Sequence, residues 1–211
     1  MSQKSRARGF FITLEGPEGS GKSSQSRRLV QTLRRRRYPV VFVSDPGSTA
    51  LGRALRRALL HTSTHLSPLA EALLFIGSRV QLVEERIQPA LARGRVVVCD
   101  RFHDSTVAYQ GCGGELSLSW LDEFGRRAIH GVMPALTILL DVPTELGFAR
   151  LHRARDRMER KTRRFHQQVR SGYVQLAQRE PKRFAIVDAS RPADEVRQQI
   201  ERIVTERLQK H

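Results

Sequence analysis

The sequence has few cysteines, few aromatic residues and no long apolar run, and each shortage excludes a class of protein. Its two cysteines, Cys99 and Cys112, are too few for a disulfide scaffold and form no CxxC pattern, so reduced thiols in a cytoplasmic protein are expected. No apolar stretch reaches the roughly 18 residues that span a bilayer, and no signal-peptide pattern is found, so no membrane partner is expected. Aromatic residues make up only 6% of the chain, which leaves little surface on which nucleic-acid bases could stack.

Acidic residues are outnumbered, with 21 Asp and Glu against 37 Lys and Arg, and the net charge is +16. Such an excess favours anionic partners, among them nucleic acid, acidic membranes and phosphorylated small molecules. Only 5 of the basic residues are Lys, however, and a biased genome composition also fills surface positions with Arg. The charge therefore indicates affinity for phosphate, and no specific nucleic-acid partner is expected from it.

Short apolar runs alternate with helical patterns along the 211 residues. This alternation predicts one α/β domain with a parallel sheet covered by helices on both faces. The expected strands are 10–15, 40–43, 95–99, 136–141 and 184–187. Helical spacing predicts helices at 22–37, 49–60, 68–93, 116–129, from about 145 with Thr144 as its N-cap, 165–180 and 193–208. Residues 1–8 are expected to form a flexible tail.

A glycine-rich loop joins the first expected strand to the first expected helix. Residues 16–23, GPEGSGKS, match the phosphate-binding pattern G-x-x-x-x-G-K-[ST]. The glycines let backbone N–H groups converge on phosphate oxygens, and the helix adds its positive N-terminal end. Lys22 is expected to reach the β- and γ-phosphates of ATP, and the Ser23 hydroxyl to ligate Mg²⁺. The expected donor-binding residues are Gly16, Pro17, Glu18, Gly19, Ser20, Gly21, Lys22, Ser23 and Ser24.

Two further segments fit phosphate chemistry. Asp100 follows an apolar strand, and a carboxylate at this place beside the glycine-rich loop is expected to hold Mg²⁺ or its waters. The planar guanidinium of Arg101 is suited to bind a phosphate oxygen. Residues 150–164 are rich in arginine and poor in apolar side chains. This composition fits a solvated basic helix as well as a mobile lid whose arginines neutralise the charge developing on a transferring phosphoryl group.

The chain resembles thymidylate kinase, the bacterial dTMP kinase family, over nearly its whole length. The resemblance rests on LEGPEGSGKS (14–23), DPGST (45–49), LLFIGSRVQLVEE (73–85), PALARGRVVVCDRF (89–102), STVAYQG (105–111), LTILLDV (136–142), DRMER (156–160), FHQQVRSGYVQLA (165–177) and IVDAS (186–190). It implies a P-loop nucleoside monophosphate kinase fold with a lid, a homodimer, and phosphorylation of dTMP to dTDP for dTTP synthesis. The phosphoryl donor would be Mg-ATP, with in-line transfer of its γ-phosphoryl group.

The resemblance also implies roles for residues in the acceptor pocket. Asp45 would lie beside the reacting phosphates, Phe75 would stack on thymine, and Arg79 would read the base and help to hold the monophosphate. Arg101 would bind the acceptor phosphate, and Glu18 would lie near the acceptor's sugar and phosphate. The other residues implied to line the base and sugar pocket are Ser105, Thr106 and Gln110.

One form of the family carries a catalytic arginine inside the P-loop, and the other takes it from the lid. Gly19 occupies that P-loop position here, so the resemblance implies the lid-arginine form. The expected catalytic residues are Glu18, Lys22, Arg101 and, as lid candidates that the sequence does not rank, Arg153, Arg155 and Arg157.

The chain departs from the family pattern at Ser44, where many relatives have arginine, at Glu115, where a cation is usual, and in a shortened lid. Two other functions stay open from the sequence. A kinase for another nucleoside monophosphate or a deoxynucleoside would keep the P-loop but have less use for Arg79 and Arg101. A nucleic-acid-binding P-loop protein, or an inactive scaffold, would need a contiguous basic face and stacking aromatics.

Overall fold

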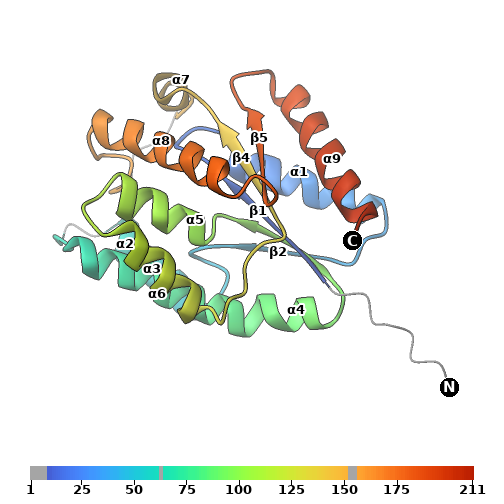
Figure 1. Ribbon diagram of the computed structural model, residues 1–211, viewed down its shortest axis with the longest axis horizontal. Helices are drawn as coiled ribbons and strands as arrows, with labels where there is room; N and C mark the ends of the chain where they lie inside the picture. The colour runs from blue at the N-terminus through green and yellow to red at the C-terminus, as the bar shows by residue number, and fades with distance from the viewer. Residues whose placement is uncertain (1–8, 62–63, 152–155) are drawn as a thin grey trace.

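The computed structural model describes residues 9–61, 64–151 and 156–211, so the expected tail and the lid candidates Arg153 and Arg155 lie outside the described residues. Parallel strands form one five-stranded sheet in the order β2-β3-β1-β4-β5, with helices on both faces (Figure 1). The strands are β1 (Phe10–Glu15), β2 (Val40–Ser44), β3 (Val96–Asp100), β4 (Leu136–Asp141) and β5 (Phe184–Asp188). The fold expected from the alternating sequence pattern is therefore confirmed.

The helices follow the expected segments. They are α1 (Lys22–Arg35), α2 (Ala50–Leu60), α3 (Pro68–Leu82), α4 (Gln88–Ala92), α5 (His103–Thr106), α6 (Leu118–Ala128), α7 (Thr144–Ala149), α8 (Arg163–Arg179) and α9 (Ala193–Gln209). Two π-helical segments, η1 (Val83–Ile87) and η2 (Val107–Cys112), join α3 to α4 and continue α5.

Several predicted element ends are wrong for identifiable reasons. The helix expected at 22–37 ends at Arg35, because Arg37 adopts a positive φ of 62°. The helix expected over 68–93 contains η1, and a single π-helical turn leaves no clear mark on apolar spacing. Thr144 does not cap α7: it is the first helical residue, and Pro143 occupies the cap position without a side-chain hydrogen bond.

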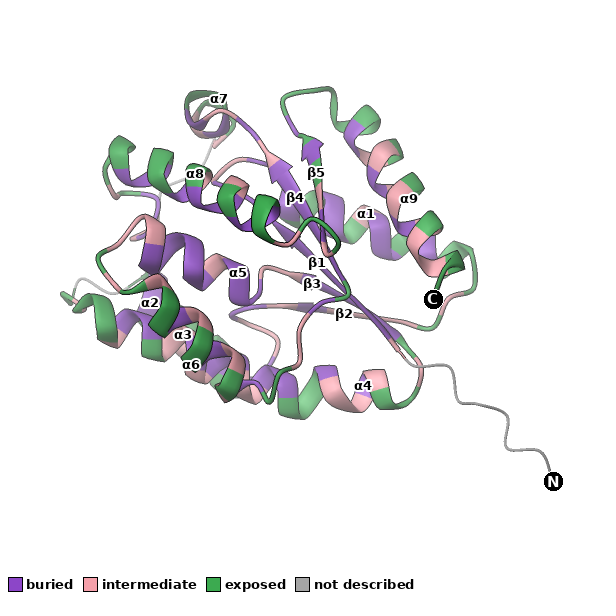
Figure 2. Cartoon of the chain, viewed as in Figure 1, coloured by how far each residue is buried: buried purple, intermediate pink, exposed green. Residues whose placement is uncertain are grey.

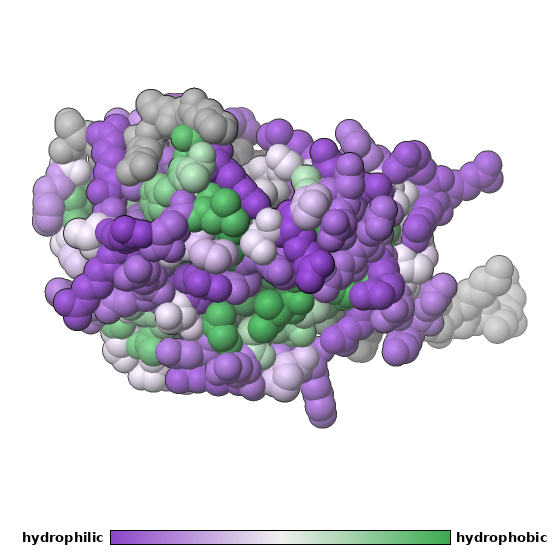
Figure 3. Space-filling view, turned by 90° about the horizontal axis from the view of Figure 1, so that it is seen from above, coloured by the Kyte–Doolittle hydropathy of each residue, from purple (hydrophilic) through white to green (hydrophobic). Residues whose placement is uncertain are grey.

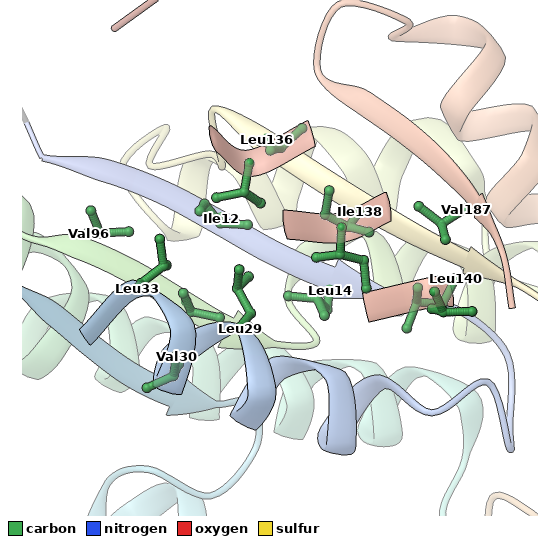
Figure 4. Packing of buried hydrophobic residues seen from close by; sticks show 14 of the residues in the cluster. Ile12, Leu14, Leu29, Val30, Leu33, Val96, Leu136, Ile138, Leu140 and Val187 are labelled. Atoms are coloured by element: carbon green, nitrogen blue, oxygen red, sulfur yellow. The ribbon is translucent and has the colours of Figure 1, made fainter. Parts of the chain in front are cut away.

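The central strands β3, β1 and β4 are buried almost throughout, whereas the edge strands β2 and β5 are only partly buried (Figure 2). On one face, Ile12 and Leu14 of β1 pack with Leu29 and Leu33 of α1 and with Ile138 of β4 (Figure 4). On the other face, a second apolar cluster joins the sheet to the segment from α3 to α4. Apolar burial on this scale fixes the sheet rigidly between its helices.

The carboxyl ends of parallel strands meet at one edge, and here they carry the expected site residues. The Asp45 amide after β2 donates to the Asp100 carbonyl of β3 at 3.0 Å, and the Arg101 amide donates to the Leu14 carbonyl of β1 at 3.1 Å. These hydrogen bonds thus join the loop after β2 to the end of β3 and the loop after β3 to β1. The face seen from above in Figure 3 is mostly hydrophilic. Among the helices that the structure describes, none is long and apolar enough to cross a membrane.

Candidate active site

A cavity of about 970 Å³ runs along the carboxyl edge of the sheet. The P-loop, Asp100 and Arg101 are among the residues that line it. At one end lie Asp45, Phe75, Arg79, Ser105, Thr106 and Gln110, and at the other lie Gln25, Arg28, Arg150 and residues 189–193. The structure therefore brings residues 18–24 and the pocket candidates into one continuous space, whereas Gly16 and Pro17 are not among the lining residues.

Lys22 lies inside the P-loop that carries it. Its Nζ donates to the Pro17 carbonyl at 2.6 Å and to the Ser20 hydroxyl at 3.1 Å. Burial lowers the pKa of Lys22 to about 8, and the Arg101 charge acts in the same direction. The carbonyl and hydroxyl hold the ammonium where a phosphate oxygen would be a stronger partner.

Ser23 and Asp100 lie together as expected for a shared cation site. The Ser23 hydroxyl donates to Asp100 Oδ2 at 2.5 Å, and both residues line the cavity. A hydroxyl and a carboxylate are the hard oxygen donors that Mg²⁺ takes, with waters and phosphates completing its shell. The pair therefore fits the implied metal. The described residues contain no cluster of three acidic, His or Cys side chains that could hold a metal ion.

Arg101 is the centre of a polar network. Its φ of 67° is uncommon for a residue other than glycine and turns the chain at the end of β3. Nη2 donates to the two Glu18 carboxylate oxygens at 3.2 and 3.3 Å and to the Tyr109 hydroxyl at 3.2 Å. Nη1 donates to the hydroxyls of Ser105 and Tyr173 at 3.3 and 3.4 Å. The guanidinium is thus held beside the P-loop residue Glu18.

Glu15 supports this network from behind, and the sequence reasoning did not single it out. Its carboxylate accepts from the Phe102 amide and the Ser105 hydroxyl, each at 2.6 Å, and from the Tyr173 hydroxyl at 2.9 Å. Burial raises the pKa of Glu15 to about 7, and the neighbouring Asp104 charge adds to the rise. The one sequence signal was its place at the end of the first strand, directly before the P-loop.

Arg79 is buried, with 2% of its surface exposed, and forms an ion pair with buried Asp45. Nε donates to Asp45 Oδ2 at 2.6 Å, and Nη2 donates to Thr106 Oγ1 at 2.8 Å. Burial raises the pKa of Asp45, while the Arg79 charge opposes the rise. Nη1 is buried and has no hydrogen-bond partner among the described residues, so Arg79 keeps one unsatisfied strong donor.

Phe75 and Gln110 lie at the Arg79 end of the cavity, where Leu60 and Met158 add apolar surface. Gln110 is buried, and its Nε2 donates to Glu71 Oε1 at 2.9 Å. Ser105 and Thr106 line the same end, but their hydroxyls are engaged with Arg101 and Arg79. In this structure these two hydroxyls orient the arginines.

The lid candidate that the structure describes, Arg157, is bound away from the P-loop. Its Nη2 pairs with Glu71 Oε2 at 2.5 Å, and its Nε donates to the Leu59 carbonyl at 2.7 Å. Gly19 has a φ of 67°, and a Cβ added there would collide with the Gly147 carbonyl of α7. The close packing of α7 thus excludes an arginine at position 19, which is consistent with a catalytic arginine from elsewhere.

The structure shows where two of the departures from the family pattern, Ser44 and Glu115, lie. Ser44 lines the cavity together with Arg56 of α2, whose Nη1 donates to the Pro46 carbonyl at 3.1 Å. Arg56 thus brings a cation beside Ser44, and sequence spacing did not reveal it. Glu115 is exposed and is not among the residues that line the cavity.

Comparison with known proteins agrees with this geometry. The family model described as thymidylate kinase matches residues 14–200. A thymidylate kinase of Deinococcus radiodurans is 45% identical over 95% of this chain and 98% of its own length, and one of Symbiobacterium thermophilum is 44% identical over 94% of each. The crystal structure of thymidylate kinase from Ehrlichia chaffeensis superposes with a TM-score of 0.77 at 30% identity, over 93% of this chain and 99% of that one. The chain belongs to the thymidylate kinase family, whose members phosphorylate dTMP to dTDP.

Proposed function

We propose that this cavity binds Mg-ATP at the P-loop and dTMP at the Arg79 end, and that the γ-phosphoryl group is transferred from ATP to dTMP. The observation that carries the proposal is the single cavity that holds both the P-loop and the Asp45–Arg79 pair. The whole chain would act as one kinase domain, with residues 150–164 as the lid.

The donor would lie along the P-loop, with its triphosphate on the backbone N–H groups of residues 16–24. Lys22 would leave the Pro17 carbonyl for the β- and γ-phosphate oxygens, which are charged acceptors. Ser23 and Asp100 would hold Mg²⁺, directly or through water, and the ion would supply charge neutralisation at the phosphates. The donor base would extend toward Gln25, Arg150 and residues 189–193.

The acceptor would lie with its thymine on the ring of Phe75. Arg79 Nη1, which lacks a partner among the described residues, would donate to a base carbonyl. Gln110 would form a second hydrogen bond with the same edge of the ring. Arg101 would exchange its bonds to Glu18 for the acceptor phosphate, and Glu18 would turn toward the sugar and phosphate. Asp45 would keep Arg79 in place, beside the reacting phosphates.

The reaction is a direct transfer between phosphates. An oxygen of the dTMP phosphate attacks the γ-phosphorus in line, a new P–O bond forms, and the bond from the γ-phosphorus to the bridging oxygen breaks, releasing ADP. Catalysis consists of positioning and charge neutralisation, which Lys22, Arg101 and an arginine of the lid would supply. Closing the lid would exclude water and so limit ATP hydrolysis.

We also propose a homodimer that acts in the cytoplasm. Exposed apolar side chains gather on two neighbouring helices, with Leu69 and Leu73 on α3 and a stacked Trp120–Phe124 pair on α6. A second copy would cover this face. Two free thiols, Cys99 and Cys112, suit a reducing compartment.

The direct test is ADP release from Mg-ATP with dTMP, dUMP, dCMP, dGMP, AMP and thymidine offered singly. A strong preference for dTMP is expected, with only moderate discrimination against dUMP, because a methyl contact is worth about 1–3 kcal/mol. Preference for another monophosphate would overturn the base-pocket assignment while leaving the transfer chemistry intact. No ADP release with any acceptor would overturn the proposed kinase activity, and the scaffold or nucleic-acid alternative would then be tested by salt-dependent binding.

A further inference from the structure

Glu71 is a buried carboxylate on α3 to which the proposed reaction gives no role. Its side chain is 3% exposed, and it contacts three groups from two other parts of the chain. Gln110 Nε2 donates to Oε1 at 2.9 Å, Arg157 Nη2 pairs with Oε2 at 2.5 Å, and Lys161 Nζ lies 3.4 Å from Oε1. A buried charge with this many partners links the acceptor pocket to Arg157 and Lys161, in the C-terminal part of the lid segment.

The carboxyl group of Glu71 stays ionised in this setting. Burial alone raises the pKa of Glu71, but the Gln110 hydrogen bond and the charges of Lys161 and Arg157 outweigh burial and lower it. Glu71 also lies in the first turn of α3, where the helix dipole stabilises negative charge. An ionised carboxylate accepts hydrogen bonds and cannot donate them.

This chemistry fixes which end of the Gln110 amide faces Glu71. Only the NH₂ group can bond an ionised carboxylate, so the amide oxygen is left for the cavity that Gln110 lines. That oxygen forms no hydrogen bond with any described residue. At the same end of the cavity, Arg79 Nη1 is a donor without a partner among the described residues.

The base end of the cavity therefore offers one donor and one acceptor of fixed polarity. A thymine ring presents a carbonyl oxygen at position 4 and an N–H at position 3, which match the Arg79 donor and the Gln110 oxygen. Cytosine presents an amino group and a bare ring nitrogen at these positions. The amino group would face the Arg79 donor, and the ring nitrogen would face the Gln110 oxygen, so neither pair could form a hydrogen bond. A pocket with this donor and this acceptor therefore disfavours cytosine, because binding it would leave buried hydrogen-bonding groups of the protein unpaired.

We infer that Glu71 is a positioning residue that sets the base specificity of the acceptor pocket, by holding the Gln110 amide with its oxygen toward the N3–H of a pyrimidine. The inference rests on the proposed placement of the base beside Arg79 and Gln110. It gives Glu71 a role through Gln110, without contact to substrate. Arg157 and Lys161 stabilise the negative charge of Glu71, and through them the C-terminal part of the lid segment is bound to the same carboxylate.

The test compares kcat and KM for dTMP and dCMP in Glu71→Gln and in the wild type. The introduced amide has the same shape as the carboxylate but donates as well as accepts, so the Gln110 amide is free to turn over. We expect kcat/KM for dTMP to fall about 10- to 100-fold, mainly through KM, while kcat/KM for dCMP stays equal or rises. Equal losses for both nucleotides, or an unchanged dTMP-to-dCMP ratio, would overturn the inference.

Three further variants separate this inference from general damage and from the proposed base placement. Glu145→Gln makes the same change at an exposed carboxylate that pairs with Arg163, and should leave the ratio unchanged. Glu71→Asp keeps a group that only accepts, and should retain more of the ratio than Glu71→Gln; the reverse order would contradict the inference. Gln110→Leu should lower the ratio at least as far, and if it does not, the base placement itself is wrong and the Glu71 role falls with it. If Gln110→Leu lowers the ratio and Glu71→Gln does not, only the role of Glu71 is wrong.

Discussion

The P-loop end and the acceptor end of the cavity present different kinds of chemical groups. The P-loop end consists of backbone N–H groups and of side chains such as Ser23, which is exposed to the cavity. The acceptor end consists of buried charged and polar groups already bound to one another, among them the Arg79–Asp45 ion pair and the Gln110–Glu71 hydrogen bond. The first end suits a triphosphate, which every nucleotide donor carries, and the second has the fixed polarity that reading one base requires.

This difference shows where the energetic cost of the site lies. The backbone N–H groups of the P-loop are positioned by the strand and helix beside them, and Lys22 is the buried charge that this region adds. Buried ions at the acceptor end lose their hydration and are tolerable only because each has close partners. Removing one partner there is expected to disturb the others.

The largest expected effect concerns the arginine that acts between the two ends. We expect one of Arg153→Ala and Arg155→Ala to lower kcat about 10³-fold, the lower range for an arginine that stabilises phosphoryl transfer. Arg157→Ala should mainly raise the KM for dTMP, because Arg157 is bound to Glu71 beside the acceptor pocket. Steady-state kinetics of the three single variants decide this. Three small and equal losses would instead favour the solvated basic helix over a lid.

A smaller effect concerns the pH dependence of stability at the acceptor end. Glu15 faces Asp104, Arg101 and the hydroxyls of Ser105 and Tyr173, and burial followed by Asp104 raises its pKa from 4.5 to about 7. Because the folded pKa is the higher one, the stability that Glu15 contributes is fully present below about pH 4.5 and is lost as the pH rises through 7. The shift corresponds to on the order of 3 kcal/mol.

Urea unfolding of the wild type and of Glu15→Gln at pH 5 and pH 8 measures this term. Glutamine cannot satisfy all the donors around position 15, so the variant should be less stable at pH 5. Its deficit should shrink or reverse at pH 8, where the wild type carries a buried charge. A difference in unfolding free energy that is the same at both pH values would contradict the role of Glu15.

The sequence predicted the sheet, its flanking helices and the glycine-rich loop, because apolar period and glycine spacing are local signals. Ser23 beside Asp100 was also predictable, since parallel strands end at one edge. The supporting layer was not: Glu15, Glu71 and Tyr173 are held by contacts between distant parts of the chain, which no local pattern encodes. The resemblance to the family named Arg79 and Gln110, but it did not show that their hydrogen bonds depend on Asp45 and Glu71.

The central claim is that donor and acceptor are held by separate sets of residues at the two ends of one cavity. Calorimetric titration of ATP and of dTMP into Lys22→Met and Arg101→Ala tests it most directly. The account predicts a crossover: Lys22→Met loses affinity for ATP while its dTMP affinity changes little, and Arg101→Ala loses roughly 10- to 100-fold in dTMP affinity while its ATP affinity changes little. Loss of ATP affinity in Arg101→Ala equal to its loss of dTMP affinity would contradict the assignment of Arg101 to the acceptor and, with it, the division of the site.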